Sequence, residues 1–135
     1  MKRQRGMASI TMVLLLLVLG SLLLSGLNQQ YQALAGRVAS ESRRIRDAAD
    51  AHSALEWGRT QRWSVSAAWQ CRQPTGIPLR VCLHIFTDGT LLLSTTGQSA
   101  RRWWSGNVVK GAAVFSPHGW SDFCPLKEEA LCQPP

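Results

Sequence analysis

A long apolar run without a charged residue lies near the beginning of the chain. The side chains from Met7 to Leu27 are predominantly apolar, and the first charge after this run is Arg37. About 20 such residues, rising ~1.5 Å each in a helix, span the ~30 Å hydrocarbon core of a bilayer. The pattern therefore predicts a membrane-spanning helix over residues 7–27.

A second periodic pattern continues the first. Positions that are apolar or ambivalent, with one acid among them, recur at alternating steps of four and three along the next stretch: Leu27, Tyr31, Leu34, Val38, Glu41, Ile45, Ala48, His52 and Leu55. No proline interrupts the stretch, so the helix is expected to continue as an amphipathic helix over residues 28–59. A buried Glu41 would need a partner, so we expect it at the rim or paired with an arginine of a neighbouring subunit.

The second half of the chain carries strand signals. Two β-prone runs, Arg80–Thr87 and Thr90–Thr96, flank Asp88-Gly89, a dipeptide that suits the type I′ turn of a β-hairpin. Further strands are expected at residues 100–104, 107–110 and 112–116. The stretch from Gly58 to Pro78 is predicted to be a turn-rich connection, and the chain from Pro117 an irregular loop.

All four cysteines follow the apolar run: Cys71, Cys82, Cys124 and Cys132. The bacterial periplasm would oxidise them, and four cysteines allow three pairings. We favour Cys71 with Cys82 and Cys124 with Cys132, because each pair closes a short loop. There is no C-x2-C spacing, and neither a metal nor a cofactor is expected.

Together these elements predict an α+β fold. A long N-terminal helix, with a membrane half and an amphipathic periplasmic half, would pack on a small antiparallel sheet with a disulfide-closed C-terminal loop. The expected divisions are a basic leader at 1–6, the apolar helix at 7–27, its amphipathic continuation at 28–59 and a periplasmic head at 60–135.

Charge fixes the expected orientation. Lys2, Arg3 and Arg5 precede the apolar run, so the N-terminus should stay in the cytoplasm and the head should be periplasmic, as in a single-pass inner-membrane protein. The run is long for a cleaved secretory signal, whereas an uncleaved anchor explains the hydropathy completely. The formal charge is +7, and without the leader 12 cations face 8 acids, which does not by itself indicate nucleic-acid binding.

The junction Arg5-Gly6-Met7 resembles the prepilin peptidase site of type IV pilins and type II secretion pseudopilins. The resemblance implies cleavage after Gly6 on the cytoplasmic face and N-methylation of the new first residue, Met7. It also implies that the apolar segment remains as the first half of a long helix, before assembly in the inner membrane and afterwards in a filament core.

One position departs from the major subunits of that family. They carry Glu at the fifth mature position, where it is thought to meet the terminal amine of a neighbouring subunit, and this chain has Thr11 there. The departure resembles the tip-located minor subunits called K in type II secretion and X in type IV pili. It implies a subunit that initiates or caps a pilus or pseudopilus, with the prepilin peptidase, the major pilin and other minor subunits as partners.

Arg101-Arg102-Trp103-Trp104 is the candidate contact surface. Paired cations beside aromatic rings can bind single-stranded DNA, although strand alternation should send one tryptophan inward and the other outward. Packing, either between subunits or in the core of the head, is favoured over DNA or a glycan. The alternative function is nevertheless an inner-membrane-anchored periplasmic protein that binds DNA, a glycan or an envelope partner through this surface.

Motifs of catalysis are not found in the sequence. It contains no G-x-S-x-G elbow, no H-E-x-x-H and no phosphate-binding glycine loop. His118 and Asp122 lie near Ser116 and Ser121, but such residues are expected in any polar turn. We therefore expect no enzymatic activity.

Overall fold

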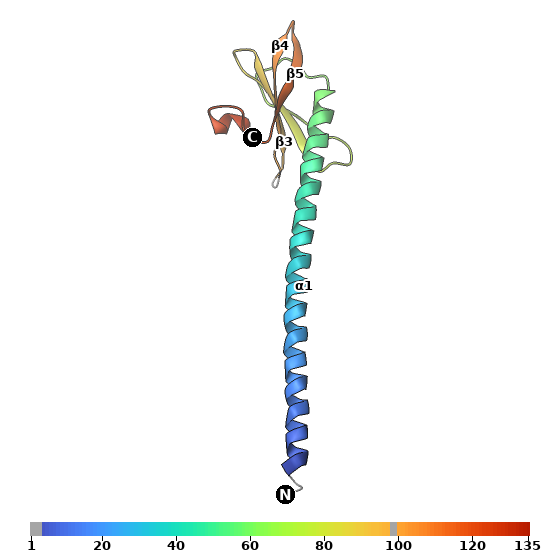
Figure 1. The fold of residues 1–135 in the computed structure, drawn as a ribbon. Helices are drawn as coiled ribbons and strands as arrows, with labels where there is room; N and C mark the ends of the chain where they lie inside the picture. Colours follow the sequence, from blue (N-terminus) through green and yellow to red (C-terminus); the bar gives the residue numbers. More distant parts are fainter. Residues whose placement is uncertain (1–3, 98–99) are drawn as a thin grey trace. The chain divides into compact units, whose positions relative to one another are not determined.

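The computed structural model of the chain describes residues 4–97 and 100–135, and shows a long helix and a five-stranded sheet (Figure 1). All pairs of neighbouring strands are antiparallel, in the order β1-β2-β3-β4-β5. The α+β class is therefore confirmed. The elements are α1 (Gln4–Arg59), β1 (Gln70–Arg72), β2 (Arg80–Ile85), β3 (Thr90–Thr96), β4 (Trp103–Val109), β5 (Ala112–Ser121) and the short 3-10 helix η1 (Glu129–Cys132).

The chain divides into two compact units within α1, one ending at Ser42 and one beginning at Arg43. In the first unit the described residues are all helical. The second unit comprises residues 43–59 of α1, the sheet and η1. The helix continues to Arg59, as the periodicity predicts, because no proline interrupts the pattern before that residue.

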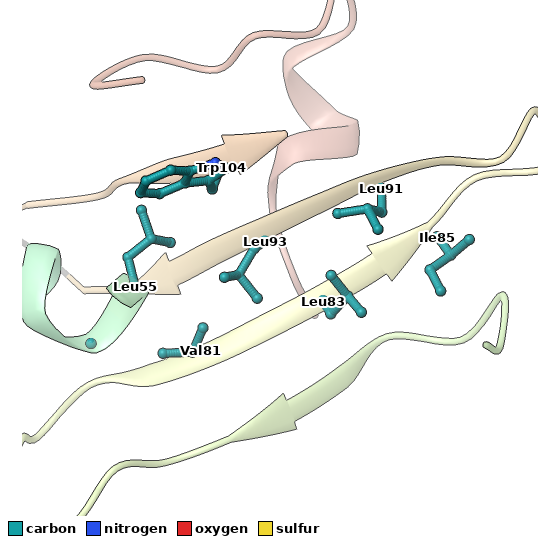
Figure 2. Packing of buried hydrophobic residues seen from close by; sticks show 8 residues of the cluster. Leu55, Val81, Leu83, Ile85, Leu91, Leu93 and Trp104 are labelled. Atoms are coloured by element: carbon teal, nitrogen blue, oxygen red, sulfur yellow. The ribbon is translucent and has the colours of Figure 1, made fainter. Parts of the chain in front are cut away.

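One face of the sheet packs on the last turns of α1. Ala51, Ala54 and Leu55 of the helix are fully buried. Leu55 lies among side chains of β2, β3 and β4 that point to the same face (Figure 2): Val81, Leu83, Ile85, Leu91, Leu93 and Trp104. Alternate residues of each strand share this face, and their burial supplies the hydrophobic core of the second unit.

Gly58 completes the contact between helix and sheet. A Cβ atom added to Gly58 would lie 2.6 Å from Cγ1 of Val81 and 3.1 Å from Cδ2 of Leu93. The buried positions are thus 51, 54, 55 and 58, whereas His52 of the predicted stripe is exposed. The heptad pattern missed this register because alanine and glycine carry little apolar signal, although their small size permits close packing.

The opposite face of the sheet is covered by the C-terminal segment. Leu92 of β3 and Trp103 of β4 form a second buried cluster with Cys132, bordered by Phe86, Cys124 and Leu126. Five consecutive residues of β3, 91–95, are buried as a result. A strand buried on both faces is typically a continuous apolar run, and Leu91-Leu92-Leu93 fits this rule.

The turn between β2 and β3 differs from the type I′ prediction. Gly89 has a φ of 84°, but Asp88 does not have positive φ. The Gly89 N–H donates to the Phe86 carbonyl at 3.0 Å, and the Phe86 N–H donates to the Thr90 carbonyl at 2.8 Å. The loop therefore has three residues, 87–89, with glycine in the left-handed position. The prediction of a two-residue type I′ turn was wrong.

Asp88 explains why the longer loop is stable. Its Oδ1 accepts hydrogen bonds from the backbone N–H of Thr90 at 2.9 Å and from its hydroxyl at 2.6 Å. These bonds also lower the pKa of the Asp88 carboxyl. Positive φ values at two successive residues, the signature of a type I′ turn, occur instead at Lys110 (51°) and Gly111 (76°), between β4 and β5.

The last strands are longer than predicted. Residues 103–109 form one strand through Gly106, residues 100–102 lie before it, and β5 continues past residue 116 to Ser121. Glycine is required at 106 because a Cβ atom there would collide with the backbone of β5. Pro117 is tolerated because β5 is an edge strand, and residues 116–119 bulge opposite Ser105.

The packing predicts that Gly58→Ala destabilises the second unit. The new methyl group would press on the stiff, β-branched side chain of Val81, and such overpacking costs about 1–3 kcal/mol of unfolding free energy. The preference of a helix for alanine, up to about 1 kcal/mol, offsets only part of this cost at the end of α1. Guanidinium unfolding of the full chain in detergent, followed by tryptophan fluorescence, measures this loss. All six tryptophans lie at or beyond Trp57, so the signal reports on the second unit.

Gly36→Ala is the matched control on the same helix. No atom lies within 4 Å of the Cβ position of Gly36. Since alanine favours a helix over glycine by about 1 kcal/mol, this variant should be as stable as the wild type or slightly more stable. Equal midpoints for the Gly58→Ala variant and the wild type would contradict the close approach of α1 to the sheet.

Candidate functional site

The proposed processing junction lies at the beginning of α1. The helix begins at Gln4, so the Gly6–Met7 peptide bond is in its first turns. The first N–H groups of a helix have no intrahelical acceptor, and helix ends fray, which makes this bond one of the easiest in α1 to unwind. Lys2 and Arg3 of the leader lie outside the described residues, and Arg5 lies in the first helical turn.

The apolar segment that follows is bare. No residue from Met7 to Leu19 is buried, and the large side chains of the segment are all well exposed. α1 is long and apolar enough to cross a membrane, and its most apolar window has no buried residue. A soluble core helix of this length would bury one face, so the segment is compatible with a single-pass membrane anchor.

The hydroxyl group of Thr11 is hydrogen-bonded within its own helix. Its hydroxyl donates to the Met7 carbonyl or to the Ala8 carbonyl, each at 3.0 Å. Such a bond to the preceding turn lets a hydroxyl sit in an apolar environment without a partner on another helix. A carboxylate at this position would instead require a partner charge in lipid.

The Arg101–Trp104 segment does not form the expected surface. Trp103 is 9% exposed and Trp104 is 6% exposed, so neither ring is available for stacking. The two rings do point to opposite faces, as alternation predicts, but both faces are covered. The Nε1–H of Trp103 donates to the Cys132 carbonyl at 3.2 Å, and that of Trp104 donates to the Ser116 carbonyl at 2.7 Å.

The two arginines of this segment also have structural partners. Arg102 forms an ion pair with Asp122 and lies over the ring of Trp120. Arg101 Nε donates to the Gly97 carbonyl at 3.3 Å, although its side chain remains exposed. The expectation that one of the two tryptophans faces outward was therefore wrong, whereas their burial agrees with packing in the core, one of the two favoured roles.

The disulfide pairing is confirmed. Cys71 of β1 is bonded to Cys82 of β2, and these residues face each other directly in the ladder. Cys124 is bonded to Cys132 and closes the segment that covers the second face of the sheet. The first bridge holds the three-residue strand β1, and the second holds the cover over Trp103.

A stack of aromatic rings around His84 was not predicted. The imidazole of His84 lies 4.8 Å from the ring of Trp69 and 4.5 Å from that of Phe86, between ring centroids. Its Nδ1 is buried, and no described residue offers it a hydrogen bond. The i, i+2 spacing of His84 and Phe86 could have placed them on one face of β2, but the approach of Trp69 depends on β1, which the sequence did not indicate.

The remaining polar candidates form no recognisable reactive cluster in the described part of the chain. Asp122 pairs with Arg102, and the Ser121 hydroxyl donates to the Phe123 carbonyl at 2.7 Å. Among residues 4–97 and 100–135, no group of three or more His, Cys, Asp or Glu side chains could hold a metal ion.

The environment of His84 predicts a pH-dependent stability. Desolvation lowers the pKa of His84 below its ordinary value of 6.5, so the unfolded chain binds a proton before the folded one does. The free energy of unfolding should be highest above pH 6.5 and should fall as the pH drops through the folded pKa. Unfolding midpoints measured at a series of pH values test this.

His84→Phe keeps an aromatic ring in the stack but removes the titrating group. In this variant the free energy of unfolding should decline less just below pH 6.5. His118→Gln, in an exposed part of β5, is the control and should retain the decline. Asp88, whose pKa is lowered from 3.8, loses its contribution only at more acidic pH, so the two windows are separate. The same decline in wild type and His84→Phe would contradict the assignment to His84.

Comparison with known proteins gives a family but no annotated relative. The model of the family described as protein of unknown function (DUF2509) matches residues 15–132. The matched range begins after Gly6, Met7 and Thr11, and contains the rest of α1 and the whole sheet. Comparisons with curated proteins and with solved structures gave no match. Because the family match covers most of the sequence, the chain belongs to the DUF2509 family.

Proposed function

We propose that the chain is a minor pilin or pseudopilin, a membrane-anchored subunit that helps to initiate or cap a type IV pilus or a type II secretion pseudopilus. A prepilin peptidase would remove residues 1–6, and Met7 would become the methylated first residue. The role is structural, and no reaction is assigned to the mature chain.

One observation carries this proposal: a single uninterrupted helix serves two different environments. Its apolar part has no buried residue from Met7 to Leu27, and its last turns are buried against an antiparallel sheet. A simple anchor needs only the first half, and a soluble α+β domain needs only the second. A helix that joins both without a break suits a subunit whose apolar part is buried among other helices after it leaves the membrane.

Thr11 supports a tip or priming role. Its hydroxyl is satisfied within its own helix, so this position makes no demand on the terminal amine of a neighbouring subunit. A subunit that begins or caps a filament can do without that contact on one side. The major pilin, other minor subunits and the inner membrane would then be its partners.

The alternative, an anchored periplasmic binding protein, has less support. It was based on an exposed Arg-Trp surface, and both tryptophans of that segment are buried. DNA binding by stacking on these rings would require removal of either α1 or the C-terminal segment from the sheet.

Gly6→Ala tests the processing step. The variant should insert into the membrane normally but keep its six-residue leader, because the peptidase of the family cuts after glycine and a side chain at this position would obstruct the cleavage site. Mobility on high-resolution gels, with and without a co-expressed prepilin peptidase, measures leader removal. We expect cleavage of the wild type to be complete and cleavage of the variant to fall by at least tenfold.

Gly20→Ala is the matched control within the same helix. No atom lies within 4 Å of its Cβ position, so this change should leave processing untouched. Equal mobility of the Gly6→Ala and wild-type products in cells that contain the peptidase would argue against the proposal and in favour of a retained anchor.

A further inference from the structure

The part of α1 between the apolar segment and the sheet carries an unpartnered apolar stripe. Tyr31, Leu34 and Val38 recur at steps of three and four, and are 73%, 60% and 61% exposed. The polar residues Asn28, Gln29 and Gln30 lie between the membrane-length run, which ends at Leu27, and this stripe. A row of large apolar side chains exposed outside a membrane marks an interaction surface.

The stripe is shaped to accept another helix. Two rows of residues spaced four apart line a shallow groove: Tyr31, Ala35 and Ala39 on one side, and Leu34, Val38 and Ser42 on the other. Small side chains in both rows let a partner backbone approach closely. Since the apolar positions repeat every 3.5 residues on average, the expected geometry is that of a left-handed coiled coil.

Glu41 occupies the next position of the same repeat. It follows Val38 by three residues, so it extends the seam that begins at Leu27 and Tyr31. The described residues include no ion-pair partner for Glu41. An unpaired carboxylate in a helix–helix seam is costly, and polar residues at such positions specify which partner is accepted.

These charges disfavour a second copy of the chain as the occupant. Copies anchored by the same apolar segment run parallel, so an in-register pair would place Glu41 against Glu41. The neighbouring edge position, Arg37, would face Ser42 of the copy, which offers no negative charge. A symmetric pair therefore gains one repulsion and no compensating ion pair.

We propose that residues 27–42 bind a parallel amphipathic helix of a different subunit, one that carries a lysine or arginine opposite Glu41 and an acidic residue beside Arg37. The apolar stripe supplies the affinity, and the two charges exclude self-pairing. The interaction joins heterologous subunits side by side beyond the membrane segment.

A charge-swapped form of the chain serves as a defined probe for this surface. Two differently tagged full chains, wild type and Glu41→Lys, are co-expressed in one bacterial membrane, solubilised in detergent and tested for co-purification. We expect at least tenfold more mixed pair than wild-type homodimer. Light scattering should show a monomer for the wild type and a dimer for Glu41→Leu, which completes the apolar seam.

Ser40→Lys is the control, since it introduces the same lysine one residue away from the seam and keeps Glu41. It should not pair with the wild type above background. A wild-type chain that dimerises as strongly as the mixture would overturn the proposal in favour of a second copy, and a Glu41→Lys mixture no stronger than the Ser40→Lys mixture would remove Glu41 from any seam.

The inference rests on the proposed function only in requiring a membrane anchor. It is separable from the processing step, because the Gly6→Ala variant retains residues 27–42 unchanged. Mixed-pair formation with the leader still attached, measured by the same co-purification, would support the helix partner even if the prepilin peptidase did not act on the chain. Absence of the mixed pair with normal leader removal would overturn the partner proposal alone.

Discussion

The close approach of α1 to the sheet at Gly58 is the contact on which the rest of the structure depends. Ala54 and Leu55 can lie against β2 and β3 only because no side chain at position 58 holds the helix away from Val81. The contact uses only the last turns of the helix. From Met7 to Leu19 no residue of α1 is buried, and this apolar part is long and apolar enough to cross a membrane.

A second constraint explains why the predicted contact surface is absent. The central strands carry apolar residues on both faces, and a single helix can cover only one of them. The segment closed by Cys124 and Cys132 covers the other, and it removes Trp103 from solvent. The two disulfides thus have different roles. Cys71–Cys82 holds the short edge strand β1 on β2, and Cys124–Cys132 holds the C-terminal segment over the sheet. In a domain of this size such bridges compensate for a small core.

Several features could be predicted from the sequence because one strong local signal specifies each of them. The end of α1, the run of β3 and both disulfide pairs follow from periodicity, β-propensity and short loop closure. The turn at Asp88 was mispredicted because the Asp side chain stabilises a three-residue loop that the dipeptide alone does not reveal. β1 and the end of β5 form strands by pairing with β2 and β4, which their own residues do not signal, and the burial of Trp103 depends on the C-terminal cover.

Some candidate functional residues could be recognised from the local sequence, and others only from the tertiary structure. The leader junction and Thr11 belong to the first kind, and the structure adds the helical geometry around them. The stack around His84 and the unpartnered stripe with Glu41 belong to the second. Periodicity indicated the stripe, but only the structure shows that Tyr31, Leu34 and Val38 are exposed.

The measurement that tests the pilin proposal most directly is the N-terminal mass of the protein purified from membranes of cells with and without a prepilin peptidase. The proposal predicts a chain that begins at methylated Met7 when the peptidase is present and an intact leader when it is absent. A chain that keeps residues 1–6 in both cells would contradict it, and would identify the protein as a permanently anchored one.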